Sequence, residues 1–537
     1  MENSVVLPQE KIAAAPAAGQ VALAHLPDLA KLAGLVTHAD GPHEATTVRL
    51  PFTGQVLGTV PICTAEDVAL ALQRARLAQA AWAQTSPAQR RRIFLRYHDL
   101  MMAHRDEFLD LIQLETGKTR LNALDEVFDV SINCRHYAAR AGRTLRPRRR
   151  KGAIPLFTRS AEVRHPRGVV GFIAPWNYPL SMAVSDPIPA LLAGNSVVLK
   201  PAEETPFTAL FAVSLLFEAG LPREVFQVVT GKGRQIGPAL LEGIDFLAFT
   251  GGTATGRRLA ALAGERLIHC SMELGGKNAA VVLDDANLDK SVEGVLHAAF
   301  SSAGQLCVHT ERLYLQDGIH DRFVEALVRR VKAMKISSAL DFDVDMGSLI
   351  SQDQFDKVSR MVAEAVSKGA RVLAGGKPRP DLGPYFYEPT LLEGVAPGME
   401  VYAEEVFGPV LCIYRFREVE QAIQAANASD YGLNASVWTR DIRLGRQVAR
   451  RIQSGTVNIN DGFSASWGSV DAPMGGMKAS GIGRRHGVDG ILKYTEAQTV
   501  AVQWGIPFGP FGILTPARYA AVMTRILRTM KDIPFLR

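Results

Sequence analysis

Residues 168–199 read GVVGFIAPWNYPLSMAVSDPIPALLAGNSVVL, and Asp186 is the only charged residue among them. A run of this length with so little charge is long enough to suggest a membrane-spanning helix. Four prolines interrupt it, however, and Asn177 and Asn195 add polar groups. Because proline breaks helical hydrogen bonding, we predict instead a buried strand, a loop, a buried helix and a second strand inside an α/β core.

The alternation of strand and helix continues beyond this run as far as residue 275. Strands are expected at Val169–Ala174, Val197–Lys200, Val225–Val229 and Phe246–Thr250. This rhythm predicts a parallel sheet. A second alternating block from Asn278 to about Val470 predicts a second α/β domain, with a cleft between the two lobes. Before the first block, amphipathic patterns predict helices at Glu66–Trp82 and Ala88–Glu115.

Composition narrows the class of protein. The 537 residues include 47% hydrophobic and 21% charged side chains, which excludes a disordered or collagen-like chain. A net charge of +6 is mild for this length, so we expect no nucleic-acid partner. Five widely spaced cysteines without a CxxC pair indicate neither a disulfide framework nor a metal site. With no secretory signal at the amino terminus, we expect a reducing, cytoplasmic location.

Two motifs that follow predicted strands suit a nucleotide. In KPAEETP (200–206), Lys200 can hydrogen-bond ribose hydroxyls and Glu203 lies near a helix start. In FTGGTATG (249–256), a glycine turn leads into a helix whose free amides favour a phosphate, a weak signal when taken alone.

A further glycine pattern, GKGRQIG (231–237), mimics a dinucleotide fingerprint. It lacks an acidic residue at the expected offset, so we interpret it as a structural turn. Gly233 is nevertheless kept among the candidate cofactor-binding residues.

Three other segments carry groups that can do chemistry. PWNYP (175–179) leaves a buried strand and offers the Asn177 amide at the sheet's carboxyl edge. MELGGKN (272–278) and SSAGQLCV (301–308) bring Glu273 and Cys307, a carboxylate and a thiol that could act as base and nucleophile. Taken singly, Cys307 is more simply an inert buried thiol, and Glu273 a surface or helix-capping acid.

Together with EEVFGP (404–409) and PMGGMKASGIGR (473–484), these segments resemble, in order and spacing, the aldehyde dehydrogenase superfamily. The resemblance covers roughly Pro51 to Val502. It implies an α/β fold of two Rossmann-like α/β domains plus a small β oligomerisation arm.

The resemblance also implies a mechanism. Cys307 would attack the aldehyde carbon, and the oxyanion would be held by the Asn177 side-chain amide and the Cys307 backbone amide. After oxidation, Glu273 would act as general base toward the water that hydrolyses the thioester. Acyl-transferring relatives typically lack this glutamate, so Glu273 favours hydrolysis, and the three groups together argue against a catalytically silent scaffold.

The cofactor residues are likewise implied by the resemblance. Glu405 would hold the nicotinamide ribose with Phe407 packed beside it, and Lys200 and Glu203 would hold the adenosine ribose. The complete set is Pro175, Trp176, Lys200, Glu203, Gly233, Gly251, Gly252, Thr253, Leu274, Glu405 and Phe407.

NAD is the favoured cofactor because the Glu203 carboxylate would repel the extra phosphate of NADP. The alternative is that Glu203 caps the following helix, which leaves Lys200 with Lys232 or Arg234 to accommodate NADP.

Within the superfamily, the chain looks most like bacterial proteins assigned as succinate-semialdehyde dehydrogenases. Ser185 and Ser301 stand where better-known members place carboxylate-binding arginines, and Arg485 replaces a frequent glutamate. The segment Phe463–Trp467 falls in the substrate tunnel and would also suit a medium-sized aliphatic or aromatic aldehyde. The alternatives to succinate semialdehyde therefore stay open.

The expected division of the chain follows from the same resemblance. It comprises an extension (1–50), an NAD(P)-binding domain (51–143 and 163–274), a catalytic domain (275–475), an arm (144–162 and 490–505) and a basic tail (506–537). The arm implies a homodimer or homotetramer.

The tail contains a basic amphipathic helix, Arg518–Lys531. We expect it to pack onto its own subunit or a neighbour, and peripheral membrane contact is the less favoured alternative.

Overall fold

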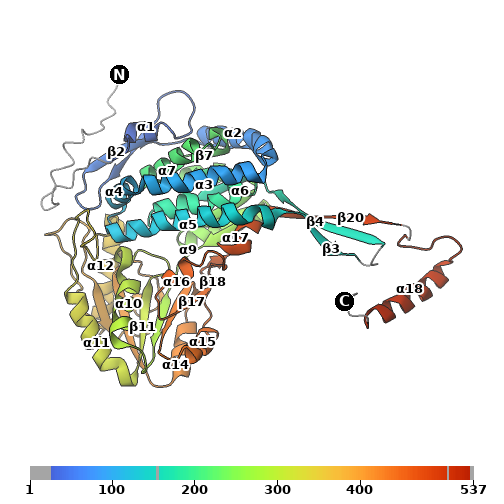
Figure 1. Ribbon diagram of the computed structural model, residues 1–537. Helices are drawn as coiled ribbons and strands as arrows, with labels where there is room; N and C mark the ends of the chain where they lie inside the picture. Colours follow the sequence, from blue (N-terminus) through green and yellow to red (C-terminus); the bar gives the residue numbers. More distant parts are fainter. Residues whose placement is uncertain (1–25, 153–156, 505–506, 533–537) are drawn as a thin grey trace.

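The structure is a computed structural model that describes residues 26–152, 157–504 and 507–532. It places two α/β domains against each other, and a thin ribbon extends from one side of them (Figure 1). Among the described residues, no helix is long and apolar enough to cross a membrane. The apolar run at 168–199 forms β5 (Val169–Ile173), a π-helical turn (Ser181–Ser185), α6 (Pro187–Leu192) and β6 (Ser196–Lys200), nearly all of it buried.

The first domain is built on a six-stranded sheet with the order β19-β9-β8-β5-β6-β7. Its neighbouring strands are parallel except for the short antiparallel edge β19. The other strands are β7 (Phe226–Val228), β8 (Phe246–Thr250), β9 (His269–Glu273) and β19 (Gly481–Ile482). The predicted strands therefore form the four consecutive strands β8-β5-β6-β7 of this sheet, each within two residues of its expected ends.

Helices cover this sheet and enclose a large apolar core. They are α1 (Leu29–Ala33), α2 (Ala65–Gln84), α3 (Pro87–Ala103), α4 (Arg105–Thr116), α5 (Arg120–Leu145), α7 (Pro206–Glu218), α8 (Gly233–Gly243), α9 (Thr253–Glu265) and α17 (Gly487–Leu492); a hairpin of β1 (Ala45–Arg49) and β2 (Val56–Pro61) precedes α2. The single helix predicted at Ala88–Glu115 is wrong, because the chain bends at His104. No proline or glycine stands at the bend, so the sequence pattern alone does not reveal it.

The second domain contains a seven-stranded sheet with the order β12-β13-β14-β11-β10-β16-β17, parallel except at β12. Its strands are β10 (Asn278–Val282), β11 (Thr310–Gln316), β12 (Arg371–Ala374), β13 (Thr390–Glu393), β14 (Val410–Phe416), β16 (Asn434–Trp438) and β17 (Thr456–Ile459). The helices are α10 (Leu288–Phe300), α11 (Asp317–Lys332), α12 (Gln352–Ser367), α13 (Glu400–Ala403), α14 (Val419–Asn427), α15 (Ile442–Ala449) and α16 (Ser464–Trp467). A two-stranded piece, β15 (Tyr431–Gly432) with β18 (Met477–Lys478), lies apart from this sheet.

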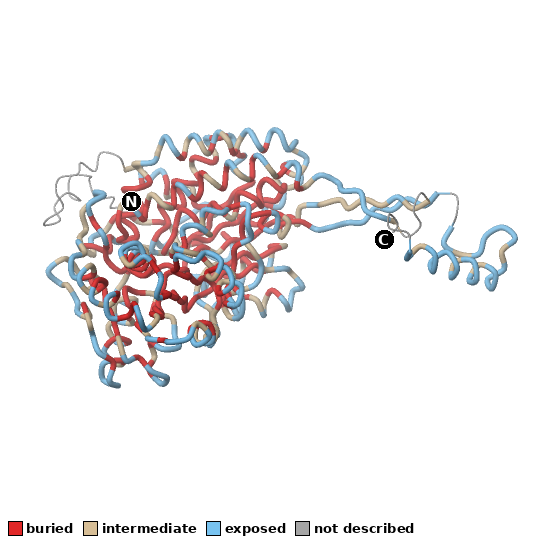
Figure 2. Tube along the Cα trace, turned by 60° about the horizontal axis from the view of Figure 1, so that its bottom comes forward, coloured by how far each residue is buried: buried red, intermediate tan, exposed pale blue. Residues whose placement is uncertain are grey.

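The ribbon is a three-stranded antiparallel sheet that stands out from the body. Its strands are β3 (Arg148–Lys151), β4 (Thr158–Pro166) and β20 (Thr495–Gln503), with β4 in the middle. Beyond its tip lies α18 (Pro516–Met530), which contains no buried residue (Figure 2). Of the two expected positions of the tail helix, packing onto its own subunit is therefore wrong, and packing onto a neighbouring subunit stays a prediction.

Candidate active site

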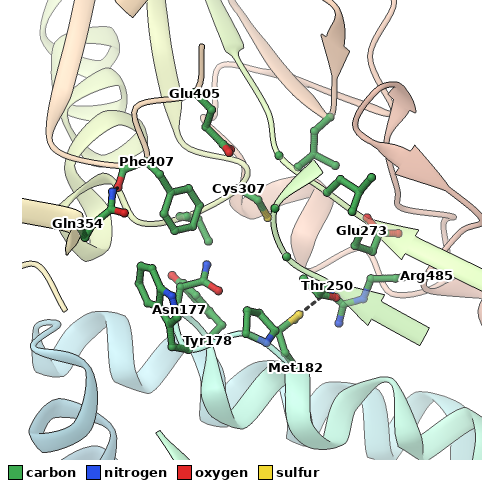
Figure 3. Close-up of a pocket in the computed structure, with 18 of the residues that line it drawn as sticks. Asn177, Tyr178, Met182, Thr250, Glu273, Cys307, Gln354, Glu405, Phe407 and Arg485 are labelled. Atoms are coloured by element: carbon green, nitrogen blue, oxygen red, sulfur yellow. Dashed lines mark hydrogen bonds between the residues drawn. The ribbon is translucent and has the colours of Figure 1, made fainter. Parts of the chain in front are cut away.

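A cavity between the two domains collects most of the predicted site residues (Figure 3). Loops at the carboxyl ends of the parallel strands β5, β8 and β9 supply one wall, and the loop before β11 supplies another. Ten predicted residues line the cavity: Pro175, Trp176, Asn177, Gly251, Gly252, Glu273, Leu274, Cys307, Glu405 and Phe407. Ligand sites of open α/β sheets form at this strand edge.

The loop that carries Asn177 is anchored by a buried ion pair. The Lys118 ammonium donates to the Asn177 carbonyl oxygen at 2.6 Å and to Glu126 at 2.7 Å. Glu126 in turn accepts hydrogen bonds from the backbone amides of Leu180 and Ser181. Both charged side chains are almost inaccessible to solvent. These contacts fix the loop between β5 and α6 on helix α5.

The Asn177 side chain points toward the loop that precedes Cys307. Its Nδ2 donates to the Gln305 carbonyl oxygen at 2.9 Å. Since an amide nitrogen carries two protons, one proton remains to donate to a ligand in the cavity. The arrangement suits the stabilisation of a negatively charged oxygen close to Cys307.

The loop before Cys307 has an unusual backbone. Ser302, Ala303 and Gly304 all have positive φ, at 52°, 54° and 70°. Side chains other than glycine rarely adopt this region, and a Cβ atom on Gly304 would collide with the Gly408 backbone. This turn places Cys307 at the cavity instead of continuing α10.

The other side of the Cys307 loop is held by Asn278. The Asn278 Nδ2 donates to the Cys307 carbonyl oxygen at 2.7 Å and to that of His309 at the same distance. A Cβ atom on Gly276 would lie 2.7 Å from the Cys307 carbonyl oxygen, so only glycine fits there. The two motifs MELGGKN and SSAGQLCV therefore meet through their backbones.

The Cys307 thiol lies in an environment that favours its neutral form. Burial, followed by the carboxylates of Glu405 and Glu273, raises the pKa of Cys307 to about 12, while Arg485 opposes them. A thiol with this pKa is weakly nucleophilic at neutral pH. Activation of Cys307 therefore requires a change in its surroundings or a proton acceptor.

Glu273 is suited to accept a proton. It ends strand β9, its side chain is 8% exposed, and its Oε1 has no hydrogen-bond partner within the described chain. Burial raises the pKa of Glu273 to about 7, although the nearby cations Arg485 and Lys493 lower it. A carboxylate that titrates near neutrality can act as a general base at physiological pH.

Glu405 and Phe407 form the opposite wall. Glu405 accepts a hydrogen bond from the Gly276 amide at 2.7 Å, and burial raises its pKa to about 7. The Phe407 ring meets the Trp176 ring edge to face at 5.5 Å between centroids. Their turn is held by the buried Glu311, which accepts from the Val406 and Phe407 amides.

The cofactor that the motifs imply fits the start of α9. Gly252 is the N-cap and forms no side-chain cap, and the first turn carries no acidic residue. The Thr253 hydroxyl is buried without a partner among the described residues, and Thr253 lines an adjoining cavity. An uncapped helix N-terminus without negative charge is a favourable site for a phosphate.

Lys200, Glu203 and Gly233 do not line the central cavity. Gly233 and Lys200 lie side by side, because a Cβ atom on Gly233 would be 3.6 Å from the Lys200 side chain. Burial lowers the pKa of Lys200, and Glu203 raises it. The three form a separate group at the ends of β6 and the start of α8.

The alternative in which Glu203 caps the following helix is wrong. The amides at the start of α7 donate instead to the buried Glu115, at 2.8 Å from both Phe207 and Thr208. Glu203 is left half-buried and is not engaged with that helix.

A second cavity, lined by Tyr178, Leu306 and Trp467 in common with the first, leads away from Cys307. Its walls are aromatic and acidic, and the other lining residues include Asp125, Phe128, Asp129 and Phe463. Ser185 donates to Asp129 at 2.6 Å, and Ser301 donates to the His297 carbonyl oxygen at 2.7 Å. Neither serine lines this cavity.

Sequence reasoning missed the buried pair Lys118–Glu126 and the capping residue Glu115. Other charged residues stand close to these in the sequence, such as Asp125 beside Glu126, so composition does not mark them. Apart from their contact with each other, Lys118 and Glu126 bind groups 54 to 59 residues away, and Glu115 binds groups 92 and 93 residues away, so no local pattern identifies the contacts.

Comparison with known proteins agrees with this geometry. Residues 37–500 match the model of the aldehyde dehydrogenase family. The chain belongs to this family and is an NAD(P)-dependent aldehyde dehydrogenase, as its motifs indicate.

Two relatives are similar over most of their length. One, from Mycolicibacterium smegmatis and provisionally named succinate-semialdehyde dehydrogenase [NADP(+)], is 47% identical over 94% of this chain and 98% of its own. Succinate-semialdehyde dehydrogenase [NADP(+)] GabD of Escherichia coli is 37% identical over 86% of this chain and 94% of its own.

Solved structures share the fold. An NADP-dependent enzyme of E. coli superposes with a TM-score of 0.84 at 36% identity, covering 89% of this chain and all of that one. The NAD+ complex of an aldehyde dehydrogenase from Bacillus cereus gives 0.81 at 35% identity, covering 86% and 93%. The predicted fold class is thus confirmed.

Proposed function

We propose that the enzyme oxidises its aldehyde through a thioester on Cys307, with Asn177 and Glu273 in the roles that the motifs imply. The observation that carries the proposal is that these three side chains, from separate loops, line one cavity. When bound, NAD(P) supplies the acceptor for the two electrons and the proton that leave the aldehyde carbon as hydride.

The chain's own residues account for the remaining steps. The Cys307 thiol first loses its proton to water, and the thiolate sulfur then forms a bond to the aldehyde carbon. The carbonyl oxygen becomes an oxyanion that accepts hydrogen bonds from Asn177 Nδ2 and the Cys307 amide. After oxidation, Glu273 takes a proton from water, whose oxygen attacks the thioester carbon. The carbon–sulfur bond breaks, and the carboxylic acid leaves with Cys307 restored.

The adenosine end of the cofactor would be held by Lys200, Glu203 and Gly233, and the phosphates by Gly251, Gly252 and Thr253. The uncapped start of α9 supports this assignment. Glu405 would hold the nicotinamide ribose, with Pro175, Trp176, Leu274 and Phe407 around it. NAD remains the favoured cofactor because Glu203 is not occupied in capping α7, although relatives carry NADP(+) in their names.

For the substrate, we propose succinate semialdehyde first, on the names of the relatives. A specific observation favours a second candidate, a neutral aliphatic or aromatic aldehyde. The second cavity has aromatic walls and two aspartates, and none of the described residues lining it is lysine or arginine. A substrate carboxylate would meet like charge there.

The proposed division of the chain is the one the motifs imply, with the ribbon of β3, β4 and β20 as the arm that joins subunits into a homodimer or homotetramer. A reducing, cytoplasmic setting is proposed because the five cysteines are free thiols.

Rapid mixing of enzyme, aldehyde and cofactor tests the mechanism. Glu273→Gln should give a burst of reduced cofactor close to one per site and then almost no steady turnover, because the thioester forms but is not hydrolysed. Cys307→Ala should give no burst. A panel with succinate semialdehyde, butanal and benzaldehyde, each with NAD and NADP, ranks the substrates. Normal steady turnover by Glu273→Gln would exclude the proposed role.

A further inference from the structure

Helix α18 has an apolar face that nothing in the described chain covers. Val522, Ile526 and Leu527 are 44%, 40% and 59% exposed, and the helix has no buried residue. Tyr519 and Met523 recur at helical spacing on the same side. A face of this kind usually lies against another surface.

The segment leading into α18 is also apolar and exposed. Trp504, Phe508 and Phe511 are 55%, 58% and 37% exposed, and Ile513 is almost fully exposed. Aromatic side chains of this kind favour the boundary between water and lipid. The exposed apolar residues therefore continue from residues 507–513 into the helix, and Figure 2 shows that this part of the chain lies outside both domains.

The charge of this part of the molecule has one sign. Residues 515–531 contain four basic and no acidic residues, and residues 143–151, which include β3, contain six basic and no acidic residues. These ten exceed the chain's net charge of +6, so the remainder is net negative. All four residues of β3 are exposed. The positive charge of the protein is thus gathered on the arm and the tail.

We propose that α18 and the segment before it dock the enzyme on an anionic lipid surface. Basic side chains beside an exposed apolar face match the headgroups and acyl chains of such a membrane. Pairing of two tails fits less well, because their meeting across a twofold axis would bring basic residues against basic residues. Docking of α18 on the net negative body of a neighbouring subunit is distinguished by light scattering. With 15 residues, α18 spans about 22 Å, so it lies along the surface and does not cross the membrane.

Sedimentation with vesicles tests this proposal on the full-length enzyme. The enzyme should pellet with vesicles of phosphatidylcholine and phosphatidylglycerol at low salt, and remain in solution with phosphatidylcholine alone. The triple variant Arg518→Gln, Arg525→Gln, Arg528→Gln should bind the anionic vesicles on the order of a hundredfold more weakly. Val522→Ser with Ile526→Ser and Leu527→Ser should also lose binding.

A matched control changes three exposed arginines on the body, Arg322, Arg329 and Arg443, to Gln; it should bind as the parent does. Turnover in solution verifies that each variant is folded. The proposal is overturned if the parent ignores anionic vesicles or if the charge variant binds as tightly as the parent. It is also overturned if the apolar variant keeps vesicle binding but falls to a smaller mass in light scattering, which would assign α18 to a neighbouring subunit.

Discussion

Arg485 donates from its Nε to the Asp186 carboxylate at 2.8 Å while its guanidinium lines the cavity that holds Glu273. Arg485 is 4% exposed, and its Nη2 has no partner among the described atoms. Its charge lowers the pKa of Glu273 against the effect of burial, whereas Asp186 raises it. The pair of opposite charges therefore adjusts the pKa of the proposed base, which burial raises.

Arg485→Met should move the acid limb of the kcat profile to higher pH. Without the cation, the carboxylate form of Glu273 is less stable, so its pKa rises above about 7 and the base is lost at neutrality. A positive charge close to a carboxyl group typically lowers the pKa of that group by about 1 to 3. The measurement is kcat between pH 5.5 and 9.5, with Arg485→Lys as the control that keeps most of the effect.

Asp186→Asn should move the acid limb of the kcat profile to lower pH, because it removes a negative charge that raises the pKa of Glu273. A purely structural role of the pair would instead lower activity at every pH without moving the limb. Two variants that shift it in the same direction would contradict the electrostatic account.

Alkylation of Cys307 in the free enzyme should accelerate with pH well beyond neutrality. The pKa of about 12 leaves little thiolate at pH 7. Glu273→Gln removes one of the carboxylates that raise this pKa, so it should increase the alkylation rate at pH 8. Mass spectrometry of iodoacetamide-treated enzyme gives the rate at this cysteine, with Cys270 as the internal reference. A Cys307 rate that is already maximal at pH 7 would contradict the expectation.

Glu115 should matter for stability, and Glu203 should not. Glu115→Ala leaves the buried amides at the start of α7 without acceptors, which costs about 1–3 kcal/mol for each group. Glu203→Ala removes no such contact, since that side chain does not cap α7. The midpoints of thermal unfolding of both variants are compared with that of the parent. Equal decreases in the two midpoints would contradict the role of Glu115 as the cap of α7.

The strand–helix rhythm and the order of the motifs were sufficient to predict the two sheets and most of the cavity. Asn177, Glu273 and Cys307 could be found because each lies in a short motif that contains glycine or proline, in the loop after β5, at the end of β9 and in the loop before β11. The residues that hold the walls of the cavity in place could not be found in this way, because Lys118 and Arg485 bind partners that are 59 and 299 residues away. The bend at His104 was missed because no proline or glycine marks it in the sequence.

The second cavity gives the last prediction, which concerns the substrate. Asp125 is half-buried in its wall, and burial raises the pKa of this carboxyl. Asp125→Asn should lower KM for succinate semialdehyde about fivefold, as expected for loss of a repulsion of about 1 kcal/mol, and leave KM for butanal unchanged. Asp99→Asn, at an exposed position on α3, is the control. For the parent, KM for succinate semialdehyde should fall as pH decreases, because the carboxyl becomes neutral. Equal effects on both aldehydes would show that Asp125 acts on the shape of the cavity and not on the charge of the substrate.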